Sequence, residues 1–207
     1  VTRQPKINPR QLTETDALGR VTRFSYDARN QQISHLDPDL VDTRFGYDAV
    51  GNRTSVRDAN GHTTLYVYDR NNMLVTTIDP NQGDASQNRV TSFTYDVTGN
   101  RTAVQDAEGR RTVYVYREDN RLLEVRTPVV ADAAGTGQTQ YSTFYEYDGL
   151  GNRIAAVDRN GARTELDSNE SGLLKRSTDA VGNVTEYRYD ANLNQIQVVV
   201  GAQLAVE

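Results

Sequence analysis

The chain has no cysteine and no tryptophan, one methionine and two histidines among its 207 residues. Without cysteine it cannot form a disulfide framework, a thiolate metal site or a cysteine nucleophile. No run approaches the roughly 20 apolar residues that a membrane-spanning helix needs, and no charged-then-apolar signal peptide opens the chain. The missing cysteines exclude a disulfide-stapled scaffold and thiol chemistry, but they do not fix the cellular compartment.

Lysine is also scarce, since only Lys6 and Lys175 occur among 23 basic residues. Arginine stacks on aromatic rings and forms forked hydrogen bonds to carboxylates better than lysine does. The net charge of -5 gives no reason to expect a nucleic-acid partner, which would need a basic stripe. Low mean hydropathy could indicate disorder, but 12 Tyr and 4 Phe recur at fixed spacing, and this regularity indicates an ordered repeat instead.

The repeat is anchored by the residue that follows the second aromatic of each copy. The anchors are Asp27, Asp48, Asp69, Asp96, Arg117, Asp148, Asn169 and Asp190, with spacings of 21, 21, 27, 21, 31, 21 and 21. The two long intervals contain loop-like insertions at about 80–88 and 128–137, as expected on one rim of an array. We therefore expect residues 1–207 to be a single array, with about eight 21-residue repeats from about 16 to 198, in a fragment of a larger protein.

Each repeat carries two aromatic residues at spacing i, i+2. This spacing places both rings on one face of a β-strand, whereas on a helix they would point about 200° apart. We expect a structural aromatic ladder in which each cross-strand pair contributes about 0.2–1 kcal/mol, with glycan stacking as the alternative use of exposed rings. The ladder residues are Phe24, Tyr26, Phe45, Tyr47, Tyr66, Tyr68, Phe93, Tyr95, Tyr114, Tyr116, Tyr145, Tyr147, Tyr187 and Tyr189.

Two turns punctuate each repeat, for example Asp48–Asn52 after the aromatic pair and Asp58–Gly61 after the second strand. Aspartate can bond back to the turn backbone, and glycine accepts the positive φ of a tight hairpin. Asparagine, the next most tolerant residue, takes the glycine place in other copies, at Asn30, Asn72 and Asn120. Two strands and two turns in 21 residues predict a continuous β-meander. Untidy apolar alternation on the second strand indicates bulges there.

The predicted fold class is therefore all-β: about sixteen short antiparallel strands in one long, twisted and curved sheet. A β-propeller is the competing architecture, because two repeats have the length of a four-stranded blade, but unequal two-repeat steps disfavour it. The unpaired edge strands of such a fragment predict self-association. The seventh copy has Leu166, Ser168 and Asn169 in place of the aromatic pair and the anchor aspartate, so we expect local looseness or a contact site there.

The stretch Tyr47–Gly61, with Tyr-Asp, then Gly-Asn, then Asp-x-x-Gly, resembles the YD repeat, also called the Rhs repeat. The resemblance implies a strip of hairpins that spirals into a hollow shell. Bacterial members, as in insecticidal toxin complexes, enclose a toxic C-terminal domain, and teneurins form a related shell at animal cell surfaces. The self-cleaving Asp-Pro-x-Gly-Leu signature of bacterial shells is not matched at Asp37-Pro38 or Asp79-Pro80. We therefore expect the cleavage segment and the cargo to be absent from this piece.

No residues indicate chemistry. The turns that begin with aspartate, which we call the acid turns, lack the spaced oxygens and terminal glutamate of an EF-hand calcium loop. Closure of the turn by the aspartate side chain is therefore the preferred explanation for these residues. His35 and His62 have no zinc-ligand spacing and lie near no nucleophile motif. We predict no catalytic, cofactor-binding or metal residues and no cofactor. The arginines after Gly-Asn, Arg53, Arg101 and Arg153, favour an arginine–tyrosine or arginine–aspartate ladder over an anionic-glycan groove.

The expected function is passive: a non-catalytic shell or scaffold segment that encloses or displays a toxin or other C-terminal cargo. Its expected partners are neighbouring repeats of the same chain and the cargo domain, without nucleic acid and without a membrane span. The resemblance implies a secreted or cell-surface protein. The alternative is an extended carbohydrate-binding surface used in adhesion.

Overall fold

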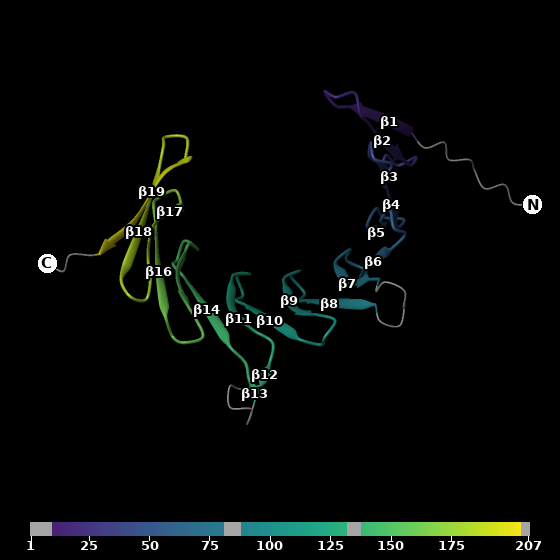
Figure 1. Cartoon of the computed structure of the whole chain (residues 1–207). Coiled ribbons are helices and arrows are strands. Elements are labelled where there is room, and N and C mark those ends of the chain that lie inside the picture. Colours follow the sequence, from purple (N-terminus) through teal and green to yellow (C-terminus); the bar gives the residue numbers. More distant parts are fainter. Residues whose placement is uncertain (1–9, 81–87, 132–137, 204–207) are drawn as a thin grey trace, which may run out of the picture. The chain divides into compact units, whose positions relative to one another are not determined.

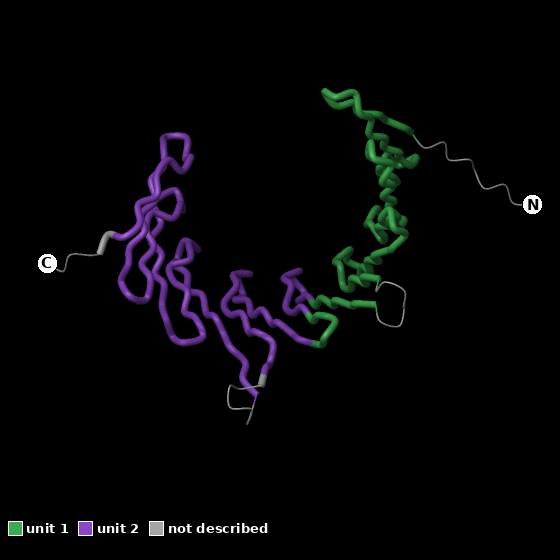
Figure 2. Tube along the Cα trace, in the orientation of Figure 1, with its two compact units in different colours: residues 1–94, 105–109 green, residues 95–104, 110–207 purple. Residues whose placement is uncertain are grey.

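The computed structural model describes residues 10–80, 88–131 and 138–203, and these residues form 19 β-strands and no helix (Figure 1). The expected fold class, an all-β chain of tandem antiparallel hairpins, is confirmed. The chain divides into two compact units, residues 1–94 with 105–109 and residues 95–104 with 110–207 (Figure 2).

Unit 1 contains strands that pair antiparallel in the order of the chain, each with the next. The strands are β1 (Arg10–Thr15), β2 (Val21–Tyr26), β3 (Gln32–Leu36), β4 (Asp42–Tyr47), β5 (Arg53–Arg57), β6 (Thr63–Tyr68), β7 (Leu74–Asp79) and β8 (Arg89–Tyr95), whose last residue belongs to unit 2. This uninterrupted pairing exceeds the four strands of a propeller blade. The propeller alternative is therefore wrong.

Unit 2 contains β9 (Arg101–Gln105), whose last residue belongs to unit 1, and ten further strands. These are β10 (Arg111–Tyr116), β11 (Leu122–Arg126), β12 (Val130–Ala131), β13 (Gln138–Thr139), β14 (Ser142–Tyr147), β15 (Arg153–Val157), β16 (Arg163–Ser168), β17 (Leu174–Thr178), β18 (Asn183–Tyr189) and β19 (Gln195–Gln203). Pairing runs in chain order from β10 to β11, then from β14 to β19, with β11 beside β14. Strands β12 and β13 form a separate ribbon.

Both insertions join the second strand of one repeat to the first strand of the next. Residues 81–87 of the first insertion and 132–137 of the second lie outside the described residues. The second insertion was expected to be a loop, but its flanks pair as β12 and β13, with Val130 opposite Thr139. Valine and threonine favour extended backbone, which accounts for the ribbon. At its base, the Thr127 N–H donates to the Tyr141 carbonyl oxygen at 2.8 Å.

A β-bulge recurs at the same place in the hairpins. The register shifts immediately before the second aromatic position, and the second strand supplies the extra residue. In the first hairpin, for example, Ser25 pairs with Ser34 while Tyr26 pairs with Gln32. The bulges suspected from the untidy second-strand pattern are confirmed. A bulge increases local twist and re-aims the neighbouring side chain, which here is the second aromatic.

The acid turns share one backbone pattern. The Asp48 N–H donates to the Asn52 carbonyl at 3.0 Å, and the Gly51 N–H donates back to the Asp48 carbonyl at 3.3 Å. This is a type I turn followed by a residue with positive φ, a common three-residue hairpin loop. The prediction that asparagine replaces glycine at this φ is confirmed, since Asn30, Asn72 and Asn120 have φ values of 62°, 62° and 63°.

Two leucines occupy the same left-handed conformation, which the sequence reasoning missed. Leu40 has φ 63° and Leu193 has φ 66°. A sequence signal for this conformation was present, because each leucine lies three residues after an aspartate, Asp37 or Asp190, as glycine or asparagine does in other turns. Leucine hid the signal, because it rarely adopts a positive φ. A left-handed backbone costs an L-residue about 1–2 kcal/mol, because its Cβ crowds the following carbonyl.

Replacing Leu40 with glycine should therefore stabilise the protein. Glycine removes the left-handed penalty but costs about 0.5–1 kcal/mol of chain entropy, so we expect a net gain of about 0.5–1 kcal/mol. The midpoint of urea unfolding, followed by circular dichroism, measures the gain. Leu18→Gly is the matched control, because Leu18 is an exposed turn leucine without a positive φ. An equal gain from both variants would show that exposed leucine, and not backbone strain, is the cause.

The sheets have little fully buried apolar surface. Among the described residues, the buried hydrophobic side chains are Ala103, Ala155 and Val184. Most aromatic residues are half-buried, and Leu65 and Val67 are more than two-fifths exposed. Each hairpin is therefore held chiefly by its neighbours in the sheet, through backbone pairing and the side-chain contacts that cross from repeat to repeat.

Candidate functional site on the aromatic face

The predicted ladder residues lie on the first strand of the hairpins, and the structure distributes them along the sheets instead of gathering them at one place. The first aromatic of a pair faces a residue of the second strand, as in Phe45↔Val56 and Tyr66↔Thr77. We call the sheet face that carries these first aromatic side chains the aromatic face. On it, Phe24 and its cross-strand partner His35 stack with ring centroids 5.2 Å apart.

Arginine connects rings on the aromatic face. The Arg53 guanidinium lies 5.8 Å from the ring centroid of Phe45 in its own hairpin and 5.7 Å from that of Tyr66 in the next. Such cation–π contacts contribute about 0.5–1 kcal/mol each at exposed sites. These contacts agree with the interpretation of the arginines after Gly-Asn as ladder residues. The corresponding contacts are Arg101 over Tyr114 at 5.5 Å and Arg153 over Tyr145 at 5.4 Å.

The second tyrosine of a pair fastens its hairpin to the preceding one. Its hydroxyl donates a hydrogen bond to the carbonyl oxygen of the residue that opens the previous second strand. The donors and acceptors are Tyr47 and Gln32 (2.9 Å), Tyr68 and Arg53 (3.1 Å), Tyr116 and Arg101 (3.2 Å), Tyr147 and Leu122 (2.8 Å), and Tyr189 and Leu174 (2.8 Å).

Sequence reasoning missed these bonds, although a signal was present. The second member of the seven pairs is always tyrosine, whereas the first is phenylalanine or tyrosine. A position that needs only an apolar ring accepts either residue, but a position that needs a donor at the end of the ring requires tyrosine. The invariance within this one chain therefore points to the hydroxyl.

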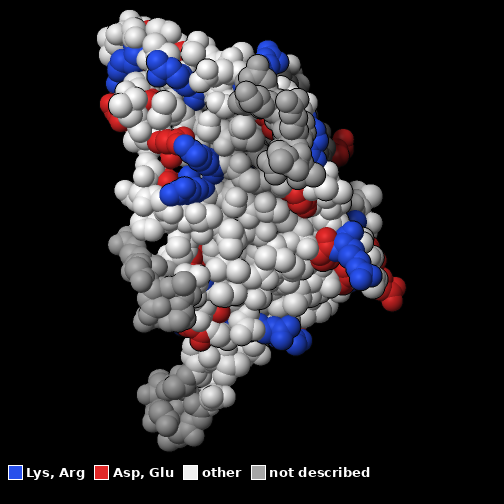
Figure 3. All heavy atoms as spheres, turned by 90° about the vertical axis from the view of Figure 1, so that its right-hand side faces the viewer, with Lys and Arg blue, Asp and Glu red and all other residues white. Residues whose placement is uncertain are grey.

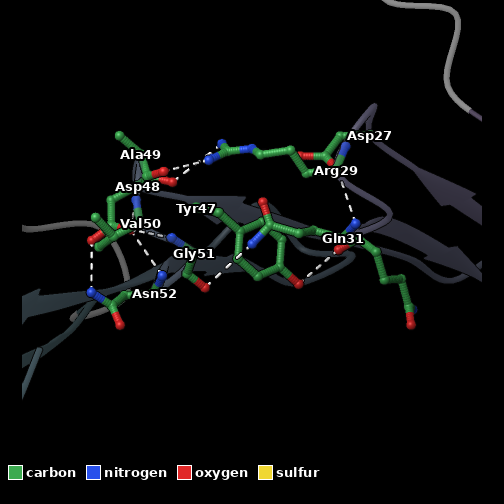
Figure 4. Close-up of polar contacts among 10 residues, drawn as sticks. Asp27, Arg29, Gln31, Tyr47, Asp48, Ala49, Val50, Gly51 and Asn52 are labelled. Atoms are coloured by element: carbon green, nitrogen blue, oxygen red, sulfur yellow. Dashed lines mark hydrogen bonds and ion pairs between the residues drawn. The ribbon is translucent and has the colours of Figure 1, made fainter.

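The acid turns after the aromatic pairs are closed by the aspartate side chain (Figure 4). Asp48 Oδ1 accepts hydrogen bonds from the N–H groups of Val50, Gly51 and Asn52 at 2.8–3.0 Å, and Asp48 Oδ2 accepts one from Asn52 Nδ2 at 2.9 Å. Both carboxylate oxygens already accept hydrogen bonds within the turn. Closure of the turn therefore explains the presence of aspartate at this place without calcium.

Polar contacts also join the acid turn after one aromatic pair to the corresponding turn of the next repeat. Arg29 donates to the Ala49 carbonyl at 2.6 Å, and Gln31 donates to the Gly51 carbonyl at 3.3 Å (Figure 4). Asn52 Nδ2 donates to Asn72 Oδ1 at 2.9 Å. In unit 2, Asn100 Nδ2 donates to Asn120 Oδ1 at 2.7 Å. These turns are thus a second place, besides the tyrosine hydroxyls, where hydrogen bonds connect one repeat to the next.

The turn hydrogen bonds lower aspartate pKa values. The side-chain amide of Asn100, aided by the Thr98 hydroxyl and backbone N–H groups, lowers the pKa of Asp96 to about 2 against the opposing effect of partial burial. The side-chain amides of Asn152 and Asn183 likewise lower the pKa values of Asp148 and Asp179.

Stability should consequently fall in acid. A carboxyl with a depressed folded-state pKa contributes stability that is complete above its unfolded pKa of about 3.9 and is lost as pH falls through the folded pKa. We expect the urea midpoint to be constant from pH 7 to about pH 5 and to decrease from about pH 4 towards pH 2. Asp96→Asn should flatten part of this decrease, because Asn169 shows that an amide oxygen can accept the same turn bonds. A midpoint that does not change between pH 5 and pH 2.5 would contradict the prediction.

The opposite sheet face carries ion pairs between arginine and glutamate side chains. In unit 2, Arg163 pairs with both carboxylate oxygens of Glu146, the longer bond being 2.9 Å. The buried Glu124 accepts hydrogen bonds from Arg126 at 2.9 Å and from Ser142 at 2.6 Å. In the view of Figure 3, basic and acidic side chains occur in small mixed groups and not as a continuous stripe of one sign. The side of the molecule seen in this view therefore offers no continuous basic stripe to an extended polyanion.

Each histidine has a contact close to it in the repeat. His35 stacks on Phe24, and His62 Nδ1 lies 3.2 Å from Asp58 Oδ2 within its own turn. Within residues 10–80, 88–131 and 138–203, no group of three or more potential ligands could hold a metal ion. The same residues contain no helix that is long and apolar enough to cross a membrane.

The chain matches a known family of repeat proteins. The RHS repeat family model matches residues 10–39, 47–84, 82–112 and 169–202, which is more than half of the chain. The chain belongs to the RHS repeat family. The repeat-to-repeat tyrosine bonds and acid turns described above are therefore features of RHS repeats in this chain. No curated protein matches the full sequence significantly.

Solved structures share the RHS-repeat fold at low sequence identity. The crystal structure of TcdB2-TccC3 without its hypervariable C-terminal region matches with a TM-score of 0.64 and 16% identity over 90% of this chain. TcdB2-TccC3-TEV matches with a TM-score of 0.59 and 16% identity over 91%. TcdB2-TccC3-Cdc42 matches with a TM-score of 0.57 and 16% identity over 94%. The RHS-repeat chain spans only 11–13% of these much longer chains.

Proposed function

We propose that this RHS-repeat chain is a non-catalytic wall segment of a larger shell that encloses or displays a toxin or other cargo domain. The observation that carries the proposal is the repeat-to-repeat fastening by the second tyrosines, for example from Tyr147 to the Leu122 carbonyl. A strip of hairpins, each held by its neighbours, can extend as a continuous barrier. The resemblance to secreted toxin shells supports a location outside the cytoplasm.

Limited proteolysis of the natural full-length protein tests this proposal. If the repeats form a wall around a domain, that domain should resist protease in the wild type and in Tyr145→Phe. Tyr147→Ala should expose it about tenfold faster or more, because a local loss of about 1.4 kcal/mol changes an opening equilibrium tenfold. Equal cleavage rates in all three proteins would count against enclosure.

A carbohydrate-binding surface is the second candidate, supported by the half-buried aromatic residues that recur along the aromatic face. Against it, guanidinium groups already lie over several ring faces, including both Phe45 and Tyr66. A glycan array at low salt separates the two functions. Reproducible binding that is lost on Tyr66→Ala or Tyr114→Ala would favour the carbohydrate surface over the wall.

We also propose that the isolated chain self-associates through an exposed sheet edge. Strand β19, the last strand described, pairs along its length with β18, and its apolar residues Ile196, Val198 and Val200 are 64%, 45% and 76% exposed. Free backbone groups beside apolar side chains favour pairing with another strand. Sedimentation velocity should show a concentration-dependent oligomer that Val198→Lys reduces. A monomer at all concentrations would refute the edge contact.

A further inference from the structure

The seventh repeat keeps the hairpin backbone but lacks both aromatic residues. Strand β16 pairs with β17 in the usual register, including the shift immediately before the second aromatic position, between Asp167 and Ser168. Asn169 still closes its turn through Oδ1. The backbone therefore presents Ser168 where the other hairpins present the fastening tyrosine, and Leu166 where they present the first ring.

The fifth repeat shows what normally occupies this place. There the Arg101 guanidinium lies 5.5 Å from the Tyr114 ring centroid, and the Tyr116 hydroxyl donates to the Arg101 carbonyl oxygen at 3.2 Å. Tyr68 makes the same bond to the Arg53 carbonyl at 3.1 Å in unit 1. The carbonyl of the arginine after Gly-Asn is thus an acceptor for a phenol hydroxyl.

Arg153 is the corresponding arginine at the seventh repeat. It retains the ring of its own hairpin, Tyr145, at 5.4 Å. The next hairpin offers Leu166 and Ser168 in place of two rings, and among the described residues no side chain donates to the Arg153 carbonyl. As whole residues, Arg153 is exposed and Ser168 is half-exposed. An acceptor that elsewhere binds a tyrosine of the same chain is here open to a tyrosine from outside.

We propose that this position binds a tyrosine side chain of a partner polypeptide. The ring lies over Ser168 beside Leu166, and its hydroxyl donates to the Arg153 carbonyl oxygen. The chemistry selects tyrosine because the acceptor is a carbonyl, which needs a donor, and the neighbouring surface suits one flat apolar ring. Phenylalanine fills the surface but leaves the acceptor unpaired. The inference concerns one position and does not depend on whether the repeats enclose a cargo.

Titration of the isotope-labelled RHS-repeat chain with p-cresol, which is the tyrosine side chain alone, tests the site by amide chemical shifts. We expect saturable shifts at residues around Arg153 and Ser168, and markedly weaker ones with toluene, which lacks the hydroxyl. Ser168→Tyr should abolish the p-cresol shifts because it fills the place with the chain's own ring. Ser168→Ala should retain them. Persistence of the shifts in a folded Ser168→Tyr protein, or equal effects of toluene, would overturn the proposal.

A second variant keeps the test valid if Ser168→Tyr does not fold. Tyr116→Ser removes the fastening ring of the fifth repeat and should create a new p-cresol site at the Arg101 carbonyl, with shifts around residues 101 and 116 that the wild type lacks. Shifts spread over all the aromatic residues would indicate nonspecific ring contacts. That result, like the absence of a new site in a folded Tyr116→Ser protein, would refute the recognition of phenol by this carbonyl.

Discussion

Replacement of Tyr147 by phenylalanine is expected to destabilise the protein by about 1 kcal/mol, and replacement by alanine by about 2–3 kcal/mol. Phenylalanine removes only the hydroxyl, which donates to the Leu122 carbonyl at 2.8 Å. A net hydrogen bond of this kind contributes about 0.5–1.5 kcal/mol. Alanine also removes the ring and its contact with the Arg121 guanidinium, 5.8 Å from the ring centroid. Because the ring is half-buried, the loss is below the about 3–5 kcal/mol of a fully buried aromatic.

The matched control for this experiment is Tyr145→Phe on the same strand. The Tyr145 ring lies beneath Arg153, but its hydroxyl makes no hydrogen bond with the described residues. We expect its removal to change stability by less than about 0.5 kcal/mol. Urea unfolding gives the global values, and hydrogen exchange of β11 and β14 shows whether the loss is local, as expected for an array held by neighbour contacts. Equal effects of the two phenylalanine variants would show that the hydroxyl bond does not fasten the hairpins.

The contrast between Tyr145 and Tyr147 also shows how far sequence could predict this protein. The i, i+2 spacing was enough to predict strands, because period two is a property of extended backbone. The recurrence of the pattern every 21 residues, apart from two insertions, was enough to predict tandem hairpins. The distinct role of the second tyrosine was not predicted, because it depends on a bulge that aims this ring at the preceding hairpin, and bulge geometry is not encoded by spacing alone.

Turn residues show a different limit. Asn72 was correctly placed at a positive φ because asparagine tolerates that conformation, but Leu40 was missed because leucine rarely adopts it. The fixed offset from the preceding aspartate was the better predictor, since the surrounding sheet imposes the turn whatever residue is present. Within a repeat, position therefore carries more information than residue preference. The same reasoning identifies Ser168 as a place where a tyrosine is missing.

Replacement of Gly151 by valine is expected to destabilise the protein by about 2–3 kcal/mol, with two causes. Gly151 has φ 98°, a conformation that costs other residues about 1–3 kcal/mol and that a β-branched side chain adopts least readily. In addition, a Cβ at this position would overlap the guanidinium of Arg121, so the arginine would have to leave its place over the Tyr147 ring.

Gly149 provides the control within the same turn. It has no positive φ, and a Cβ added there would meet no atom within 4 Å. Gly149→Val should therefore change the urea midpoint little, by less than about 0.5 kcal/mol, although it adds the same side chain two residues away. A second comparison separates the two causes: Arg121→Ala relieves the overlap, so Gly151→Val should be less harmful in that background, and the remainder measures the backbone strain. If both glycines tolerated valine equally, the positive φ that closes these turns would not limit which residues the repeat accepts.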